Sequence, residues 1–229
     1  MAKDVIVACD FPSREAFDAF LALFTDCKPF LKIGMELYYA CGPDIVKEAK
    51  RRGHKVFLDL KLHDIPNTVG KATSVLNELG ADICNVHAAG GVKMMAAART
   101  ALREDALLIA VTQLTSTSAQ MLKEELLIDQ PMEDVISHYA LNAKAAGLNG
   151  IVCSPLEAAV VKKVCGEDFI TVTPGIRFAD AAADDQVRIT TPAKAREIGS
   201  DYIVVGRPIT AAQDPVAAYK RCVAEFLNK

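Results

Sequence analysis

Residues 55–64 bring charged side chains into an apolar segment in a pattern that could do chemistry. They read Lys55-Val-Phe-Leu-Asp59-Leu-Lys61-Leu-His-Asp64. The β-branched and apolar content predicts a strand over 55–62, and side chains two apart on a strand share one face. Asp59 and Lys61 therefore point the same way. The opposite face is apolar and suits packing under helices, so we expect the acid and the amine to face the interior.

Buried charge at Asp59 and Lys61 indicates a function. An ionised group normally leaves water only when it is paired, hydrogen-bonded or required by function, because the desolvation penalty is large. For a lone Asp-x-Lys the alternative is a structural ion pair. Further charges at the ends of neighbouring predicted strands argue against that alternative: Asp10, Lys32 and Asp64. A packed core has no need of such an array, so we favour a catalytic site.

Eight short β-branched segments position these residues. They alternate with longer stretches of helical periodicity, which is typical of repeated βα units around a parallel sheet. The predicted strands are 5–10, 30–34, 55–62, 81–88, 107–114, 150–154, 169–176 and 202–206. The predicted helical stretches are 13–24, 43–52, 67–79, 92–103, the longer 119–146, 155–164, 192–198 and 215–226.

This alternation predicts an α/β protein, a single (β/α)8 TIM barrel domain over residues 1–229. No linker or composition shift divides the chain, and its length suits one barrel. An open doubly wound sheet is the alternative, but it usually has fewer strands and needs a phosphate loop that the sequence lacks. Barrel enzymes place their chemistry at the C-terminal ends of the strands, where the charged residues fall. Ser13, Thr191 and Asp214 fit helix N-caps, and Gly53, Gly80, Gly147 and Gly199 fit helix stops.

Composition excludes several classes of partner. The formal net charge of −3 gives no basic surplus for nucleic acid or anionic lipid. No apolar run approaches the ~20 residues that span a bilayer, and the N-terminus, Met-Ala-Lys-Asp, lacks the apolar segment of a signal peptide. The seven cysteines form no Cys-x-x-Cys pair and no cluster with the four histidines. We expect a cytoplasmic protein without a metal site, in which strand cysteines act as small buried hydrophobes.

Two segments after the last predicted strands could bind a phosphate group. Thr173-Pro-Gly-Ile-Arg177 follows the seventh strand, and Gly206-Arg207 follows the eighth. Barrels often bind phosphate there through backbone N–H groups, and a guanidinium group matches a pair of phosphate oxygens. A solvated turn is the alternative for a lone Gly-Arg, but its position favours an anion site. Residues of about 177–191, with Gln186 and Arg188, form a connection long enough to predict a lid, the alternative being a surface loop without a role.

Residues 57–69 resemble the signature of the orotidine 5′-monophosphate decarboxylase family, whose core reads Asp-x-Lys-x-x-Asp-Ile-Pro-x-Thr. Here the segment is Phe-Leu-Asp-Leu-Lys-Leu-His-Asp-Ile-Pro-Asn-Thr-Val. Further elements agree along the chain: Cys9-Asp10, Lys32-Ile-Gly34, Leu114-Thr-Ser116, Thr173-Pro-Gly-Ile-Arg177, Gln186 and Val205-Gly-Arg-Pro208. The resemblance covers essentially the whole chain in the compact form typical of bacterial enzymes, with no departure at a functional position.

The resemblance implies conversion of orotidine 5′-monophosphate to uridine 5′-monophosphate, the last step of de novo pyrimidine nucleotide synthesis, without a cofactor or metal. It implies a catalytic set with Lys61 as proton donor, together with Asp59, Asp64 and Lys32. The implied substrate-binding residues are Asp10, Lys32, Asp59, Thr68, Thr115, Pro174, Arg177, Gln186, Gly206 and Arg207. It also implies a homodimer in which Asp64 and Thr68 enter the partner subunit's site. His87 is left without a role.

Two other functions stay open. A magnesium-dependent sugar-phosphate decarboxylase or hexulose-phosphate synthase of the same barrel superfamily shares the Asp-x-Lys-x-x-Asp pattern. Ile65-Pro-Asn-Thr68 and the predicted lid with Gln186 favour the nucleotide enzyme. The second alternative is a nucleotide-binding barrel that has lost turnover, and the complete set of acids and lysines argues against it.

Overall fold

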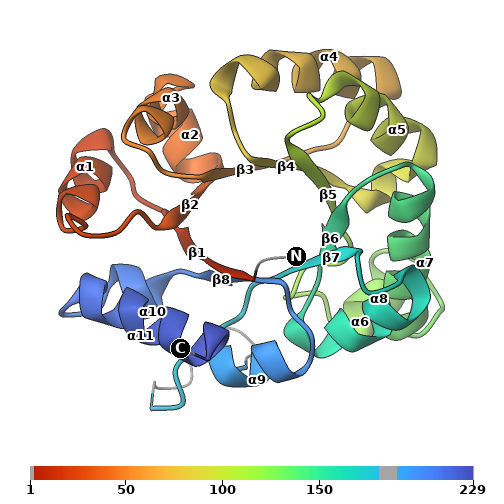
Figure 1. The fold of residues 1–229 in the computed structure, drawn as a ribbon. Helices are drawn as coiled ribbons and strands as arrows, with labels where there is room; N and C mark the ends of the chain where they lie inside the picture. The colour runs from red at the N-terminus through yellow and green to blue at the C-terminus, as the bar shows by residue number, and fades with distance from the viewer. Residues whose placement is uncertain (1–2, 181–189, 229) are drawn as a thin grey trace.

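A closed parallel barrel forms the centre of the molecule in the computed structural model, which describes residues 3–180 and 190–228. Within these residues each strand pairs with the next in chain order, and the first closes against the last. Helices surround this ring (Figure 1). The strands are β1 (Asp4–Ala8), β2 (Phe30–Gly34), β3 (Val56–Leu62), β4 (Ile83–His87), β5 (Leu107–Val111), β6 (Gly150–Val152), β7 (Ile170–Thr173) and β8 (Tyr202–Val205). The predicted TIM barrel is confirmed.

The helices follow the predicted order with additions. They are α1 (Arg14–Ala22), α2 (Met35–Cys41), α3 (Asp44–Arg51), α4 (Pro66–Leu76), α5 (Gly91–Ala101), α6 (Ala119–Glu124), α7 (Met132–Ala145), α8 (Ala158–Cys165), α9 (Pro192–Glu197), α10 (Arg207–Thr210) and α11 (Pro215–Leu227), with 3-10 turns at Asn77–Leu79, Ala88–Gly90 and Pro155–Glu157. The helical stretch predicted over 119–146 is two helices, because Leu127 has a positive φ of 55° and Pro131 precedes α7. Helices α2 and α10 were not predicted, since they are too short to show helical periodicity.

The predicted N-caps and the glycines at helix ends are confirmed. The side chains of Ser13, Thr191 and Asp214 each accept a backbone N–H from the first turn of α1, α9 and α11. Proline occupies the start of both α9 and α11. The four glycines predicted to stop helices all have positive φ. None of the described helices is long and apolar enough to cross a membrane.

Strand alternation divides the core into two clusters. One lies inside the barrel and contains Ile6, Ala8, Phe30, Phe57, Ile83, Ile109, Ile170, Val172 and Val204. The larger cluster packs the outer strand faces against the helices. Two residues further along several strands, the inward positions become polar or charged, including Lys32, Asp59 and Asn85. The barrel is therefore filled with apolar side chains below a polar layer at its C-terminal end.

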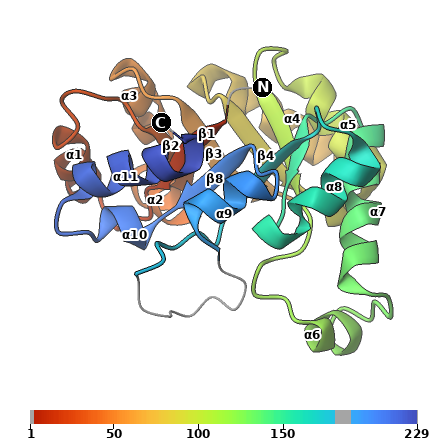
Figure 2. The same ribbon diagram turned by 60° about the horizontal axis from the view of Figure 1, so that its bottom comes forward.

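A repeated polar arrangement closes the N-terminal end of the barrel. The residues just before β4, β6 and β8 each accept a backbone N–H from near the start of the preceding strand, and each also binds a cation from a helix. The pairs are Asp82 with Lys50, Asn149 with Arg99, and Asp201 with Lys162. This end lies opposite to α6, which projects from the other side of the barrel (Figure 2). Charge here stabilises the fold, whereas the opposite end carries the candidate chemistry.

Candidate active site

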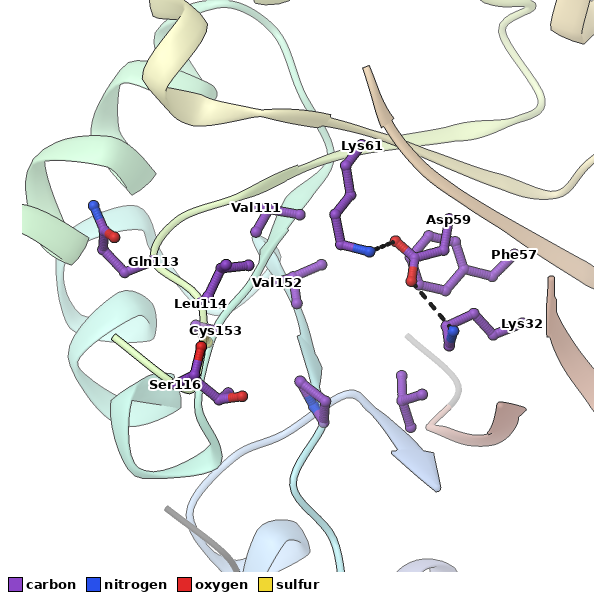
Figure 3. Close-up of a pocket in the computed structure, with 13 residues that line it drawn as sticks. Lys32, Phe57, Asp59, Lys61, Val111, Gln113, Leu114, Ser116, Val152 and Cys153 are labelled. Carbon is purple, nitrogen blue, oxygen red and sulfur yellow. Dashed lines mark hydrogen bonds and ion pairs between the residues drawn. The ribbon is translucent and has the colours of Figure 1, made fainter. Parts of the chain in front are cut away.

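Asp59, on β3, is the centre of an ion-pair network at the C-terminal end of the barrel. Its Oδ1 atom lies 2.7 Å from Nζ of Lys61, and its Oδ2 atom lies 3.4 Å from Nζ of Lys32 on β2. Lys32 in turn lies 3.0 Å from Oδ1 of Asp10, two residues after β1. Figure 3 shows the two lysines approaching the carboxylate from different sides. Four residues named from the sequence therefore meet at one place.

Electrostatics favour the ionised forms of Asp59 and Lys32. Asp59 is only 7 % exposed, and burial alone would raise the pKa of its carboxyl group. The charges of Lys32 and Lys61 and the hydrogen bonds outweigh burial, so the pKa of Asp59 lies below its ordinary value. Burial would lower the pKa of Lys32, but Asp59 and Asp10 outweigh it and raise that pKa. The site therefore holds alternating charges around the buried carboxylate of Asp59.

The strand that carries Asp59 and Lys61 is less regular than the sequence pattern suggested. The register of β3 against β4 shifts between Leu58 and Leu62, and Lys61 has a φ of 52°. A bulge of this kind can re-aim a side chain next to an active site. The alternation of side chains along a strand thus explains why Asp59 points inward. It explains the position of Lys61 only in part, because the bulge also changes it.

Asn85, on β4, belongs to the network and was missed by the sequence interpretation. Its Nδ2 atom donates to Oδ1 of Asp59 at 2.7 Å, and its Oδ1 atom accepts the backbone N–H of Lys61 at 2.8 Å. The residue is 1 % exposed. The sequence could have indicated Asn85 through its position two residues after Ile83, which faces inward. A polar side chain that faces inward at the level of Asp59 needs a hydrogen-bond partner there.

A cavity of about 250 Å³ lies against the charged network. Its charged wall is formed by Lys32, Asp59 and Lys61, and most of the remainder is apolar or comes from the loop after β5: Phe57, Val111, Gln113, Leu114, Thr115, Ser116, Val152, Cys153, Pro174 and Val204. Figure 3 shows these side chains around the opening. A flat, partly apolar ring with an anionic substituent fits such a site, the anion lying at the charged wall.

The candidate phosphate-binding residues lie in the loops that follow two neighbouring strands. Pro174, just after β7, lines the cavity, and half-buried Arg177 follows, donating from Nη1 to the backbone oxygen of Ile176 at 2.9 Å. Gly206 and exposed Arg207 follow β8, which pairs directly with β7. The two loops therefore start side by side. Gln186 and most of the predicted lid lie outside the described residues.

Asp64 and Thr68 do not join the network within this chain. Both are exposed, and Asp64 accepts the backbone N–H of Ile65 at 2.6 Å. Among residues 3–180 and 190–228, Asp64 forms no ion pair with a lysine of the site. Their expected place in the site of a partner subunit remains a prediction.

Histidine and cysteine side chains also lie around this site, and Cys153 lines the cavity. Burial lowers the pKa of His87, and the nearby charges of His63 and Lys61 lower it further. The cysteines are all free, and burial raises the pKa of Cys84 to about 12, as expected of a buried hydrophobe. Within the part of the chain that the structure describes, no group of three His, Cys, Asp or Glu side chains could hold a metal ion.

Comparison with known proteins gives a consistent result. The family model described as "Orotidine 5'-phosphate decarboxylase / HUMPS family" matches residues 3–222. The chain is 57% identical over 222 residues to an orotidine 5′-phosphate decarboxylase of Streptococcus thermophilus, with 96% of each chain covered. It is 56% identical over 233 residues to that of Bacillus caldolyticus, covering 99% of this chain and 96% of the other. The crystal structure of orotidine 5′-phosphate decarboxylase from Lactobacillus acidophilus superposes with a TM-score of 0.87 at 41% identity, covering 98% of this chain and 99% of that one.

Proposed function

Because the chain belongs to the orotidine 5′-phosphate decarboxylase / HUMPS family, it is an orotidine 5′-phosphate decarboxylase of pyrimidine biosynthesis, and we propose that Lys61 protonates the ring carbon that carbon dioxide leaves. The observation that carries this role is the 2.7 Å contact of the Lys61 ammonium with Asp59 at the cavity wall. A cation held there faces the space that a bound pyrimidine would occupy.

The reaction requires electrostatic stabilisation of the negative charge that develops on the ring carbon. The bond between the ring carbon and the carboxylate breaks, and its electron pair stays on a carbon with no conjugated sink. The Lys61 ammonium stabilises that pair and then gives it a proton, which leaves a neutral amine that solvent reprotonates. The product is uridine 5′-monophosphate. We propose that no cofactor or metal takes part, because the two lysines supply the positive charge.

Asp59 takes a secondary role in this proposal. It lies beside the substrate carboxylate, and two like charges about 4 Å apart repel by roughly 4 kcal/mol at an effective dielectric constant of about 20. Departure of carbon dioxide relieves that repulsion. Enzymes commonly lower the barrier by about 8–23 kcal/mol, so stabilisation by Lys61 has to contribute more than repulsion does. Lys32 and Asp10 hold Asp59 and bind the ribose hydroxyl groups.

The rest of the nucleotide binds away from the reacting carbon. Thr115, on the cavity wall, donates to the pyrimidine ring. Pro174, Arg177, Gly206 and Arg207 bind the phosphate, because these residues follow the paired strands β7 and β8. Gln186 reaches the phosphate and the ring from the predicted lid over residues 177–191. Phosphate binding then helps to hold Asp59 and Lys61 in place, and so it supports turnover as well as affinity.

We propose that two subunits share their sites, with Asp64 and Thr68 entering the site of the partner subunit. Exposed apolar residues beside Asp64 and further along α4 support an interface: Ile65 is 65 % exposed and Val75 is 62 % exposed. A monomer normally leaves few such side chains together in water. The net charge of −3 supports a protein that does not bind nucleic acid, and we propose that it acts in the cytoplasm.

One assay tests the function. Purified protein is mixed with orotidine 5′-monophosphate in the presence of EDTA, and the fall in ultraviolet absorbance is followed. We expect complete conversion to uridine 5′-monophosphate without added metal. Loss of activity on EDTA treatment, restored by magnesium, would instead favour a magnesium-dependent sugar-phosphate enzyme of the same barrel superfamily. Binding of the nucleotide without turnover would favour a non-catalytic barrel.

A further inference from the structure

We propose that Asn85 is a positioning residue for the decarboxylation, which fixes Asp59 and Lys61 relative to each other through the two ends of its side-chain amide. The inference rests on the proposed function of these two residues. Strand β3 contains a bulge, and there the side chain of one residue of β4 accepts a backbone N–H of β3.

The register shows where the bulge lies. Leu58 of β3 is paired with Cys84 of β4, and Leu62 is paired with Val86. Three residues of β3, numbers 59–61, therefore face the one residue of β4 between those pairs, which is Asn85. A regular parallel ladder has no hydrogen-bond partners for the additional backbone groups. The side chain of Asn85 supplies one.

The first contact holds the backbone of Lys61. Lys61 has a φ of 52°, a left-handed conformation that costs a residue with a side chain about 1–2 kcal/mol. Oδ1 of Asn85 accepts the Lys61 N–H at 2.8 Å in this conformation. Without that acceptor the partly buried N–H would lose this hydrogen bond, which would favour relaxation of the strand to a less strained conformation. Relaxation would move the lysine side chain that begins at the same residue.

The second contact holds the carboxylate of Asp59. Nδ2 of Asn85 donates to Oδ1 of Asp59 at 2.7 Å, and the same oxygen accepts Nζ of Lys61 at 2.7 Å. The orientation of the amide follows from these contacts, because a flipped amide would place an oxygen against the carboxylate and a nitrogen against an N–H. Both ends of the amide are thus used, and both act on the acid–lysine pair.

Asn85 acts through its neighbours. It is 1 % exposed and does not line the cavity, whereas Asp59 and Lys61 both do. It is also neutral, so it can hold the carboxylate without displacing either cation. A misplacement of about 1 Å at a reacting group can reduce turnover by about 100-fold, so the loss of this side chain is expected to act on kcat.

The first test is Asn85→Leu, which keeps the branching and the number of side-chain heavy atoms and removes both hydrogen bonds. We expect kcat to fall by up to about 100-fold while uridine 5′-monophosphate still binds. The control is Thr171→Val, which removes a hydroxyl from a side chain that is 0 % exposed at the opposite end of the barrel. Thermal unfolding of both variants separates lost stability from lost positioning. A kcat for Asn85→Leu equal to that of the control would overturn the proposal.

The second test is Asn85→Asp, which has its own pH signature. A protonated carboxyl group offers one donor and one acceptor, as the amide does, whereas an ionised one places a second negative charge against Asp59. Burial and that charge raise the pKa of the new group. The ratio of variant to parent kcat should therefore be high at low pH and fall as the pH rises. A ratio that is constant with pH would contradict a positioning role.

The parent enzyme serves as the reference for both tests. If it does not decarboxylate orotidine 5′-monophosphate, the proposed function fails, and the inference about Asn85 fails with it. If the parent turns over and both Asn85 variants behave like the control, only the positioning role is overturned.

Discussion

The ammonium group of Lys61 lies 2.7 Å from the Asp59 carboxylate, inside a barrel whose other inward side chains at this level include the buried amide of Asn85. The second oxygen of the same carboxylate lies 3.4 Å from Lys32. Asp59 therefore has a cation for each oxygen, which explains why it stays ionised although it is buried. A substrate with its own carboxylate therefore adds a second negative charge to a site whose two lysines already surround the carboxylate of Asp59.

Lys61→Ala is expected to reduce kcat by more than about 10³-fold, because in the proposed mechanism Lys61 supplies both the stabilising charge and the proton. Binding of uridine 5′-monophosphate should persist, since the phosphate site that we propose lies after β7 and β8. The measurements are the absorbance assay and calorimetric titration with the product. Exposed Lys163→Ala is the matched control. Normal turnover in the Lys61 variant would remove the role assigned here.

Asp59→Asn is expected to change how stability depends on pH. The pKa of Asp59 is lower in the folded protein than its ordinary value. The unfolded chain therefore binds more protons between the two values, so this contribution to stability is present above the ordinary carboxyl pKa and is lost as the pH falls through the folded value. Measured unfolding free energies should show a weaker loss on acidification in the variant than in the parent. Equal slopes for the two, with Asp168→Asn as an exposed control, would contradict this.

Arg207→Ala is expected to weaken nucleotide binding about 10- to 100-fold, which corresponds to loss of a charge-assisted hydrogen bond of about 1.5–3 kcal/mol. The effect should depend on the phosphate. Uridine 5′-monophosphate should therefore lose affinity, whereas uridine should not. The control is Arg51→Ala, which removes an exposed arginine paired with Glu48 on α3. An equal loss for nucleotide and nucleoside would place Arg207 outside the phosphate site.

Strand periodicity was enough to predict the barrel and to bring Asp59 and Lys32 together, because inward direction follows from alternation. It was not enough for Asn85. Its contacts depend on a bulge that arises from the pairing of β3 with β4, and pairing is a property of two segments rather than of one. The short helices α2 and α10 were missed for a local reason, since a helix of one or two turns has no measurable period.

Lys162→Met is expected to lower the free energy of unfolding by about 3–5 kcal/mol, because it leaves the Asp201 carboxylate buried without its cation. The ammonium lies 2.6 Å from that carboxylate, and the two side chains are 9 % and 14 % exposed. Turnover at 25 °C should be unchanged, since the pair lies at the N-terminal end of the barrel. Chemical denaturation and the absorbance assay test the two parts. A loss of kcat in folded protein would show that the two ends of the barrel are coupled.

Mixing two inactive variants tests whether subunits share their sites. If Asp64 serves the site of the partner subunit, a dimer of Asp64→Ala subunits lacks this carboxylate in both sites. A dimer of Lys61→Ala subunits likewise lacks the lysine in both sites. In a mixed dimer, however, the subunit with intact Lys61 receives an intact Asp64 from its partner, so one of the two sites is complete. Activity should therefore return when the two variants are unfolded together and refolded. For equal amounts and random pairing, half the dimers are mixed and each mixed dimer has one complete site. The activity should then approach about a quarter of the parent value. Mixing without exchange of subunits is the control. If refolded mixtures stay inactive although mixed dimers form, Asp64 acts within its own chain, and the exposed position that it has here would have to change when substrate binds.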